Sequence, residues 1–357
     1  MNSVKAMLAG ALTVIMLATG LGVATVSLAQ EADEAPGEPP SPECQAFAAD
    51  PNADVGDVLR AGCRPTVEQM SALMDNPLGN VAMLFTQVDW MVKNEPNSGR
   101  EDMQINYMGI AQFPKKLNDN WNLINRVVWN VVSVPLDLDN DSGFGSSPGD
   151  GGILPPPDGF PPSANPPLPI DLFRGRTTGF GDMTYVGLFS PSATKKLGEG
   201  NFTWGAGFDI GMPTASEDIL GTGKWTAGPT ALAVYMGPKW KVGGLLTHFK
   251  DFSGDSDRAD VNLTNLQYFL FYSLNDTTSI GMAPNIICNW EQSSGNECSV
   301  PIGLGFVTTA KIGKVPFRFG AEVHYTVIQP DDVLATKWNF RFYFIPAAPS
   351  ALFGWMN

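Results

Sequence analysis

Long stretches of this chain alternate apolar and polar residues, which is the two-residue period of a β-strand. In the stretch 101–113, Met103 and Ile105 fall on an apolar face, whereas Gln104 and Asn106 fall on the opposite, polar face. The same pattern recurs in three more stretches, at 264–274, 316–327 and 338–344. Only 16% of the residues are charged and 38 are glycine, which favours strands joined by turns over long helices. We therefore predict an all-β fold in which each strand has one apolar face.

Turn residues divide the alternating region into about twelve strands. Several are longer than the roughly 5–6 residues usual in globular proteins, and they match the about 9–11 tilted residues that cross a bilayer. We predict a closed antiparallel transmembrane β-barrel over residues 79–346. The expected strands are 80–93, 101–113, 121–134, 177–190, 202–212, 223–236, 239–250, 261–274, 277–288, 298–311, 315–328 and 335–346.

The connections between these strands fall into two alternating sets. Those at 237–238 and 275–276 are short, whereas those at 135–176 and 251–260 are long, and only 191–201 departs from the contrast. Lysines gather in the short set and aspartates in the long set. Outer-membrane barrels have short periplasmic turns and long external loops. A soluble sandwich, which also alternates, has no reason to sort its connections in this way.

The first 29 residues differ from the rest of the chain. Lys5 precedes an apolar run over 6–26, and Ser27-Leu28-Ala29 resembles a signal-peptidase site. We predict a cleaved signal peptide over 1–29, with a retained membrane anchor as the alternative. No later apolar stretch reaches the about 20 residues of a membrane-spanning helix.

Residues 30–78 are expected to form a periplasmic linker that ends in a short helix. The linker is rich in Glu, Ala and Pro, and Val67, Met70, Leu73 and Met74 then recur at helical spacing. At the other end, residues 347–357 form a C-terminal tail beyond the last strand.

The four cysteines lie at 44, 63, 288 and 298. An even number in an exported chain predicts two disulfides, and proximity favours Cys44 with Cys63 and Cys288 with Cys298. A zinc site is the alternative, but no histidine lies near either pair.

Catalytic motifs are few in this sequence. It contains no GxSxG and no HExxH, and the calcium-like stretch 137–143 departs from an EF-hand loop at its sixth position. We predict no enzyme, metal or cofactor, although His324 beside Glu322 could form an acid–base pair. The net charge of −14 argues against nucleic acid as a partner, because phosphate binding needs clusters of Lys and Arg.

Polar side chains on the face opposite the apolar one are predicted to line the lumen. Four of them lie on the last two strands and could form one charged patch, which either sets the selectivity of a pore or only stabilises a closed barrel. The pore-lining candidates are Gln104, Asn106, Arg126, Asp182, Asn265, Gln267, Arg318, Glu322, His324 and Arg341.

Four segments in order, 118–136, 179–191, 221–229 and 254–262, resemble signature stretches of the outer-membrane family linked to the MetA pathway of phenol degradation. The resemblance covers roughly 76–346. It implies a barrel and the passage of small molecules, because members are labelled transporters. The N-terminal cysteine segment and the tail beyond Phe344 depart from the family pattern.

Together these features predict an outer-membrane channel or facilitated-diffusion transporter for small molecules, aromatic or apolar ones included. The alternatives are a structural or surface-interaction barrel with a plugged lumen, and a hydrolase built on a barrel. The expected partners are outer-membrane lipid, a small-molecule permeant and the barrel-insertion machinery, which would read the aromatic stretch 338–344.

Overall fold

The computed structural model describes residues 66–79, 82–94, 100–136, 175–312, 315–330 and 335–346, which all belong to the compact unit Ser41–Asn357. Several predictions lie outside the described residues. These are the signal peptide 1–29, the linker up to residue 65 with Cys44 and Cys63, most of the loop 135–176 including 137–143, and the tail 347–357.

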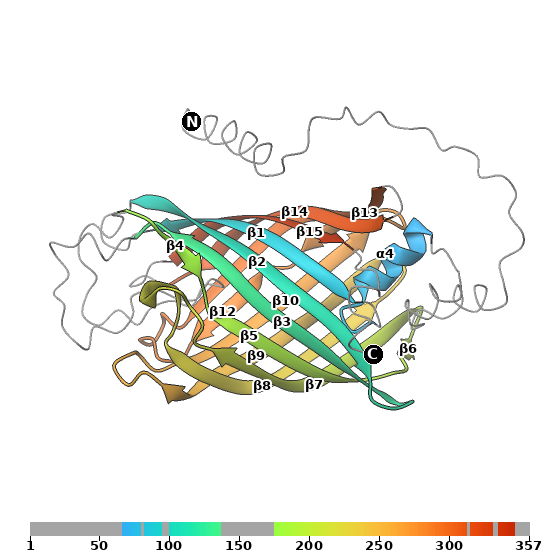
Figure 1. Ribbon diagram of the computed structural model, residues 1–357. Helices are drawn as coiled ribbons and strands as arrows, with labels where there is room; N and C mark the ends of the chain where they lie inside the picture. The colour runs from blue at the N-terminus through green and yellow to red at the C-terminus, as the bar shows by residue number, and fades with distance from the viewer. Residues whose placement is uncertain are drawn as a thin grey trace, which may run out of the picture. The chain divides into compact units, whose positions relative to one another are not determined.

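The described strands form one antiparallel sheet that closes on itself (Figure 1). Strands β4 and β5 both pair with β3 and act as one interrupted wall strand, as do β11 and β12 between β10 and β13. Strand β6 only extends the hairpin to β7, so the described wall has 12 strands, which confirms the predicted barrel. The bounds are β1 Met83–Asn94, β2 Glu101–Lys116, β3 Trp121–Val134, β4 Thr177–Phe180, β5 Met183–Pro191, β6 Lys195–Leu197, β7 Gly200–Met212, β8 Lys224–Met236, β9 Trp240–Gly254, β10 Asn262–Ser273, β11 Thr278–Met282, β12 Asn285–Asn289, β13 Cys298–Ile312, β14 Val315–Ile328 and β15 Ala335–Pro346.

Two wall strands that the sequence predicts as continuous are interrupted. The second break falls at Ala283 and Pro284, where proline has no amide hydrogen to donate to the ladder. Its carbonyl still accepts from the Tyr268 amide at 3.2 Å, so the chain stays attached to β10. The first break, at Gly181 and Asp182, lies where β4 and β5 meet.

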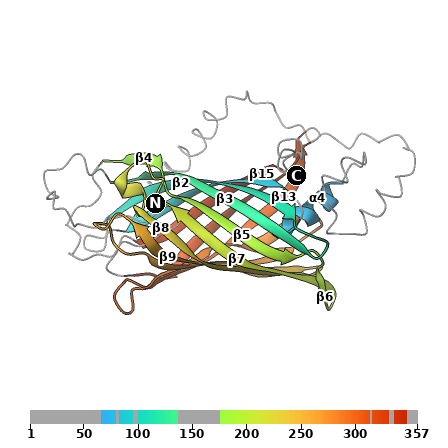
Figure 2. The same ribbon diagram turned by 60° about the horizontal axis from the view of Figure 1, so that its bottom comes forward.

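The two ends of the barrel differ (Figure 2). One end, called here the short-turn end, has the connections 117–120, 237–239 and 274–277. The other, the long-loop end, has wider connections such as 213–223, which includes the 3-10 helix η1 Asp218–Leu220. The connection 192–199 belongs to the short-turn end and is long because β6 continues the ladder there.

Asparagine side chains build two of the tight turns. The Oδ1 atom of Asn118 accepts from the backbone amides of Asn120 and Trp121 at 2.9 and 3.0 Å. The Oδ1 atom of Asn275 accepts from those of Thr277 and Thr278 at 3.0 and 2.8 Å. Such local bonds replace the missing ladder partners where the chain reverses.

The outer surface of the wall is apolar and carries aromatic side chains near both ends. At the short-turn end Trp121 meets Trp204 with ring centroids 6.1 Å apart, and at the long-loop end Tyr325 meets Trp338 at 4.7 Å. Two such girdles mark the interfaces of a membrane barrel. The exposed aromatics include Trp121, Trp204, Trp240 and Phe344 near the first end, and Trp225, Phe252, Trp290, Tyr325 and Trp338 near the second.

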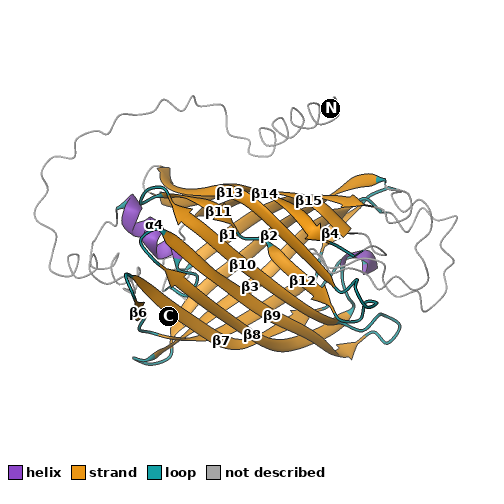
Figure 3. Cartoon of the chain, turned by 180° about the vertical axis from the view of Figure 1, so that it is seen from behind, coloured by secondary structure: helices purple, strands orange, loops and turns teal. Residues whose placement is uncertain are grey.

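A short helix, α4 Val67–Asp75, lies at the short-turn end (Figure 3). Its N-terminus carries a capping box, since the Thr66 side chain accepts from the Gln69 amide while the Gln69 side chain accepts from the Thr66 amide. Met70, Leu73 and Met74 are buried, as their helical spacing predicts. No helix in the described part of the chain has the length and apolarity to span a bilayer.

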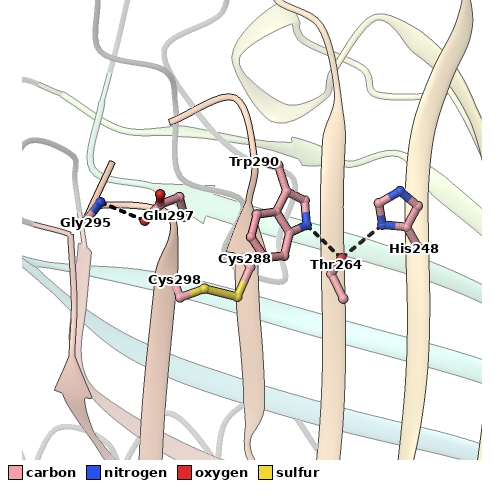
Figure 4. The surroundings of a disulfide bond; sticks show 7 residues. All are labelled: His248, Thr264, Cys288, Trp290, Gly295, Glu297 and Cys298. Carbon is pink, nitrogen blue, oxygen red and sulfur yellow. Dashed lines mark hydrogen bonds between the residues drawn. A yellow bond between two sulfur atoms is a disulfide. The ribbon is translucent and has the colours of Figure 1, made fainter. Parts of the chain in front are cut away.

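The predicted disulfide Cys288–Cys298 is present and joins β12 to β13 near the long-loop end (Figure 4). Next to it, the Thr264 hydroxyl accepts from the Trp290 indole nitrogen at 2.9 Å and lies 2.9 Å from His248 Nδ1. Register places Cys298, Cys288, Thr264 and His248 in one row across four strands. This row braces the outer surface of the wall.

Replacing both Cys288 and Cys298 with serine should lower the free energy of unfolding by about 2–3 kcal/mol, because the bridge closes a short loop in the unfolded chain. Urea unfolding of the refolded barrel, followed by tryptophan fluorescence, measures the change. Dithiothreitol should destabilise the wild type more than the serine variant, because only the wild type has this bridge to reduce. Equal unfolding midpoints for wild type and variant would contradict the role assigned to this bridge.

Candidate functional site

A row of charged side chains crosses three adjacent strands on the inner face of the wall. Register places Glu322 on β14 opposite Arg341 on β15, and Arg341 opposite Asp89 on β1. The Arg341 Nε donates to Asp89 Oδ1 at 2.8 Å. All three side chains are buried. The row therefore places a cation between two anions, which is the order that offsets the cost of removing these charges from water.

Polar groups from the neighbouring rows bind the two carboxylates of this row. Asn339 Nδ2 donates to Asp89 Oδ1 at 2.7 Å, and Gln87 Nε2 donates to Asp89 Oδ2 at 2.5 Å. On the other side His324 Nε2 lies 2.8 Å from Glu322 Oε2. We call Asp89, Glu322, His324, Asn339 and Arg341 the lumen network.

The break between β11 and β12 is bound to the lumen network. The Ala283 amide donates to Glu322 Oε2 at 2.7 Å, and its carbonyl accepts from Arg341 Nη1 at 2.8 Å. Since β13 lies between β12 and β14 in the wall, the chain at Ala283 must project into the lumen to make these bonds. The interruption at Pro284 thus provides backbone groups that partly satisfy two buried charges.

Helix α4 is held in the short-turn end by ion pairs to the wall. Asp75 Oδ2 lies 2.5 Å from Lys241 Nζ on β9, and its other oxygen pairs with Arg318 on β14. The Ser71 hydroxyl accepts from the Thr309 hydroxyl on β13 at 3.2 Å. These contacts bind one small helix to three wall strands.

The residues after the helix enter the lumen. Leu78 packs in an apolar cluster with Ile124, Val186, Leu188, Leu232 and Val234. A Cβ atom at Gly205 would lie 3.3 Å from Leu78 Cδ2, so the absence of a side chain on β7 leaves room for this contact. The helix and Leu78 together form a plug at the short-turn end.

Above this plug lies a cavity of about 280 Å³. The plug contributes Met74, Asp75 and Pro77 to its lining. The wall contributes two kinds of side chain, and both kinds face the same space. The apolar ones include Ile110, Val128, Leu245, Phe249 and Phe269, and the polar or charged ones include Gln112, Arg126, Gln267, Glu322 and Arg341.

The predicted pore-lining residues occupy three kinds of place. Six line the cavity: Arg126, Asn265, Gln267, Arg318, Glu322 and Arg341. Gln104, Asn106 and His324 are buried but are not part of its lining. Asp182 lies at the break between β4 and β5, where its oxygens accept from the Thr214 and Thr222 amides at 3.0 and 2.7 Å. It therefore fastens the long-loop connection 213–223.

The charged patch expected on the last two strands is divided. Glu322, His324 and Arg341 share the lumen network, whereas Arg318 pairs with Asp75 of the plug. Sequence reasoning missed Asp89, Asp75 and Lys241. The alternation of β1 could have revealed Asp89, because its neighbours Val88 and Trp90 belong to the apolar face. Asp75 and Lys241 meet only through the placement of the helix.

A closed antiparallel barrel with an aromatic-girdled apolar exterior and a charged lumen is an outer-membrane β-barrel. The protein is a component of the bacterial outer membrane. The sequence model of the family described as "Putative MetA-pathway of phenol degradation" matches residues 104–341, and the chain belongs to that family. The resemblance drawn from the four signature segments is confirmed.

Solved structures that resemble the chain are distant in sequence. The COG4313 outer membrane channel from Pseudomonas putida F1 is 12% identical, covers 74% of this chain and 95% of its own, and has a TM-score of 0.47. Outer membrane phospholipase A from Escherichia coli is 11% identical, covers 77% and 93%, and has a TM-score of 0.38. A Pseudomonas aeruginosa FadL homologue is 12% identical, covers 76% and 76%, and has a TM-score of 0.30. No curated protein matches the sequence.

Replacing Arg341 with methionine should destabilise the barrel by about 3 kcal/mol, because Asp89 and Glu322 would remain buried without their shared cation. Adding Asp89→Asn should restore part of the loss, since one carboxylate is then removed. A double-mutant cycle in urea gives the coupling between the two residues.

Lys337 provides a matched control on the same strand. Its Nζ lies 3.1 Å from Glu101 Oε1, but both side chains are more than one third exposed. Lys337→Met should therefore cost less than about 1 kcal/mol. Additive losses for Arg341→Met and Asp89→Asn would show that the lumen network does not act as a unit.

Proposed function

We propose that this barrel is a channel for the facilitated diffusion of small molecules, aromatic or apolar ones included, across the outer membrane. The observation that supports it is a lumen cavity with mixed polar and apolar walls, closed at the short-turn end by a plug that forms few ion pairs among the described residues. Passage is passive and follows the concentration gradient.

The cavity walls support the permeant class. Phe249 and Phe269 face the same space as Gln112 and Gln267, so a bound molecule can bury an aromatic ring while its polar groups keep hydrogen bonds. Ligand pockets of this kind are mostly apolar with a few polar groups that fix orientation. A wide aqueous pore would instead expose a continuous polar wall.

The plug is suited to movement because few polar contacts attach it to the wall within the described residues. Helix α4 spans Val67–Asp75, and Asp75 alone holds the ion pairs that join it to β9 and β14. An isolated helix of this length is not stable in water, so its folding depends on contacts with the wall. Release of Asp75 would leave the plug held by the Ser71–Thr309 hydrogen bond and by apolar packing, and loss of these weaker contacts would open the cavity at the short-turn end.

The competing proposal is a structural barrel whose lumen stays closed. A plug that never moves would favour this proposal. The hydrolase proposal requires a nucleophile beside the His324–Glu322 pair. Among the residues that the structure describes, no serine is hydrogen-bonded to His324. The channel is therefore preferred, and conductance separates it from the plugged barrel.

Asp75→Asn should raise single-channel conductance in a planar bilayer several-fold, because Lys241 and Arg318 lose the carboxylate that holds the plug. The wild type should show smaller or briefer openings in the same bilayer.

The Arg341→Ala, Glu322→Ala double variant should change ion selectivity, since both side chains line the cavity.

Asp119→Asn is the matched control for the plug variant. It removes an ion pair with Lys116 of 2.9 Å at the same end of the barrel, but this pair is exposed in a turn and does not touch α4. It should leave the conductance unchanged. An inserted barrel that stays closed both as wild type and as Asp75→Asn would favour the structural alternative.

A further inference from the structure

One cation in the cavity lacks the partner that the others have. The cationic lining residues are Arg126, Lys241, Arg318 and Arg341, and the acidic ones are Asp75 and Glu322. Lys241 and Arg318 share Asp75, and Arg341 is bound to Asp89. Within the described residues Arg126 forms no ion pair, and its Nε has no hydrogen-bond partner. The cavity lining therefore has an excess of positive charge.

Arg126 is buried where an unpaired charge is costly. Its exposed fraction is 9%, and its strand neighbours on the inner face are Ile124 and Val128. Transfer of a lone charge into such surroundings disfavours folding unless something pairs with it. Strongly perturbed charged groups cluster at functional sites, which makes Arg126 a candidate binding residue.

Gln112 lies directly opposite Arg126 in the β2–β3 register and also lines the cavity. It is fully buried, and neither its Oε1 nor its Nε2 has a partner among the described residues. Side chains directly opposite on neighbouring strands have Cβ atoms about 4.5–5.5 Å apart. One carboxylate can therefore accept from the Arg126 guanidinium and from Gln112 Nε2 together.

In the next row of the wall, the residues on β2 and β3 are apolar. Ile110 and Val128 face each other one step closer to the long-loop end, and both line the cavity. Leu245 and Phe269, from β9 and β10, pack against the apolar cluster that contains Val186. A molecule whose anionic group meets Arg126 thus places its body among aliphatic and aromatic side chains.

We propose that Arg126 and Gln112 form a binding site for the carboxylate of a small aromatic acid that passes through the lumen. The proposal rests on the channel function and specifies its permeant class. A volume of about 280 Å³ lies near the lower end of the roughly 300–1,000 Å³ range of ligand pockets, which suits one ring with its acid group. Planar guanidinium and carboxylate groups bind each other through two parallel hydrogen bonds, which gives both affinity and orientation.

Asp209 is the acidic residue that could compete for Arg126. It lies in the same row two strands away, with Val186 between them, and it does not line the cavity. Among the described residues Asp209 forms no ion pair or hydrogen bond with Arg126, so it does not neutralise Arg126. Asp209→Asn should therefore leave the binding of an aromatic acid intact.

The test compares benzoate with its neutral analogue benzamide by calorimetric titration of the refolded barrel. Wild type should bind benzoate at least about tenfold more tightly, and Arg126→Met should abolish this preference. Arg176→Met is the matched control, because Arg176 donates to the Ser133 and Met103 carbonyls outside the cavity. It should keep the wild-type preference.

Stability separates a binding residue from a structural one. Arg126→Met removes an unpaired buried charge and should not lower the unfolding midpoint, whereas a structural arginine would destabilise the barrel when lost. Gln112→Leu is the second variant, and it should weaken benzoate binding several-fold without removing the charge.

Equal binding of benzoate and benzamide by the wild type, or a preference that survives Arg126→Met, would overturn the proposed site. Conductance of the same preparation tests the channel separately. Conductance without benzoate preference would leave the channel and remove the acid site. Benzoate preference without conductance in any variant would leave a binding barrel and remove the channel.

Discussion

This structure depends on one constraint: within the bilayer, every backbone N–H and C=O group must find its hydrogen-bond partner inside the protein. A sheet in a bilayer has no water to satisfy an open edge, so its first and last strands must pair. Here β1 pairs with both β2 and β15, and this closure divides each strand into a face toward lipid and a face toward the lumen. The polarity of the chain then follows strand by strand, with aromatic girdles outside and charges inside.

Closure also creates the electrostatic problem that the lumen must solve. Charges placed on the inner face lose much of their contact with water, so each must find a partner across strands or in the plug. Arg341 finds Asp89, while Arg318 and Lys241 find Asp75. Arg126 is the exception among the cationic residues of the cavity lining, and this contrast directs attention to it as a site for an external anion.

The sequence predicted the wall well because lipid and lumen differ strongly in polarity at every second residue. The alternation that assigned Gln104 and Asn106 to the inner face is the same one that buries them. The strand breaks at Asp182 and Pro284 could not be predicted from the alternation of apolar and polar residues. Asp182 accepts a hydrogen bond from the loop residue Thr222. Pro284 follows Ala283, whose backbone amide and carbonyl are hydrogen-bonded to Glu322 and Arg341.

The site itself was only partly predictable. Opposite residues such as Arg341 and Asp89 are 252 positions apart in the chain, so their meeting depends on which strands close the barrel and in what register. The plug is a second case, because helical spacing predicts the helix but not where it docks. The unpaired state of Arg126 and Gln112 is visible only when all their neighbours are known.

The position of the lumen network at the seam between β1 and β15 has a consequence for assembly. These strands come from opposite ends of the barrel sequence, and their pairing completes the wall. A slip of one residue along this seam would turn every side chain of one strand to the opposite face and drive Arg341 or Asp89 into lipid. The Arg341–Asp89 pair therefore favours the native register over misaligned pairings of β1 with β15.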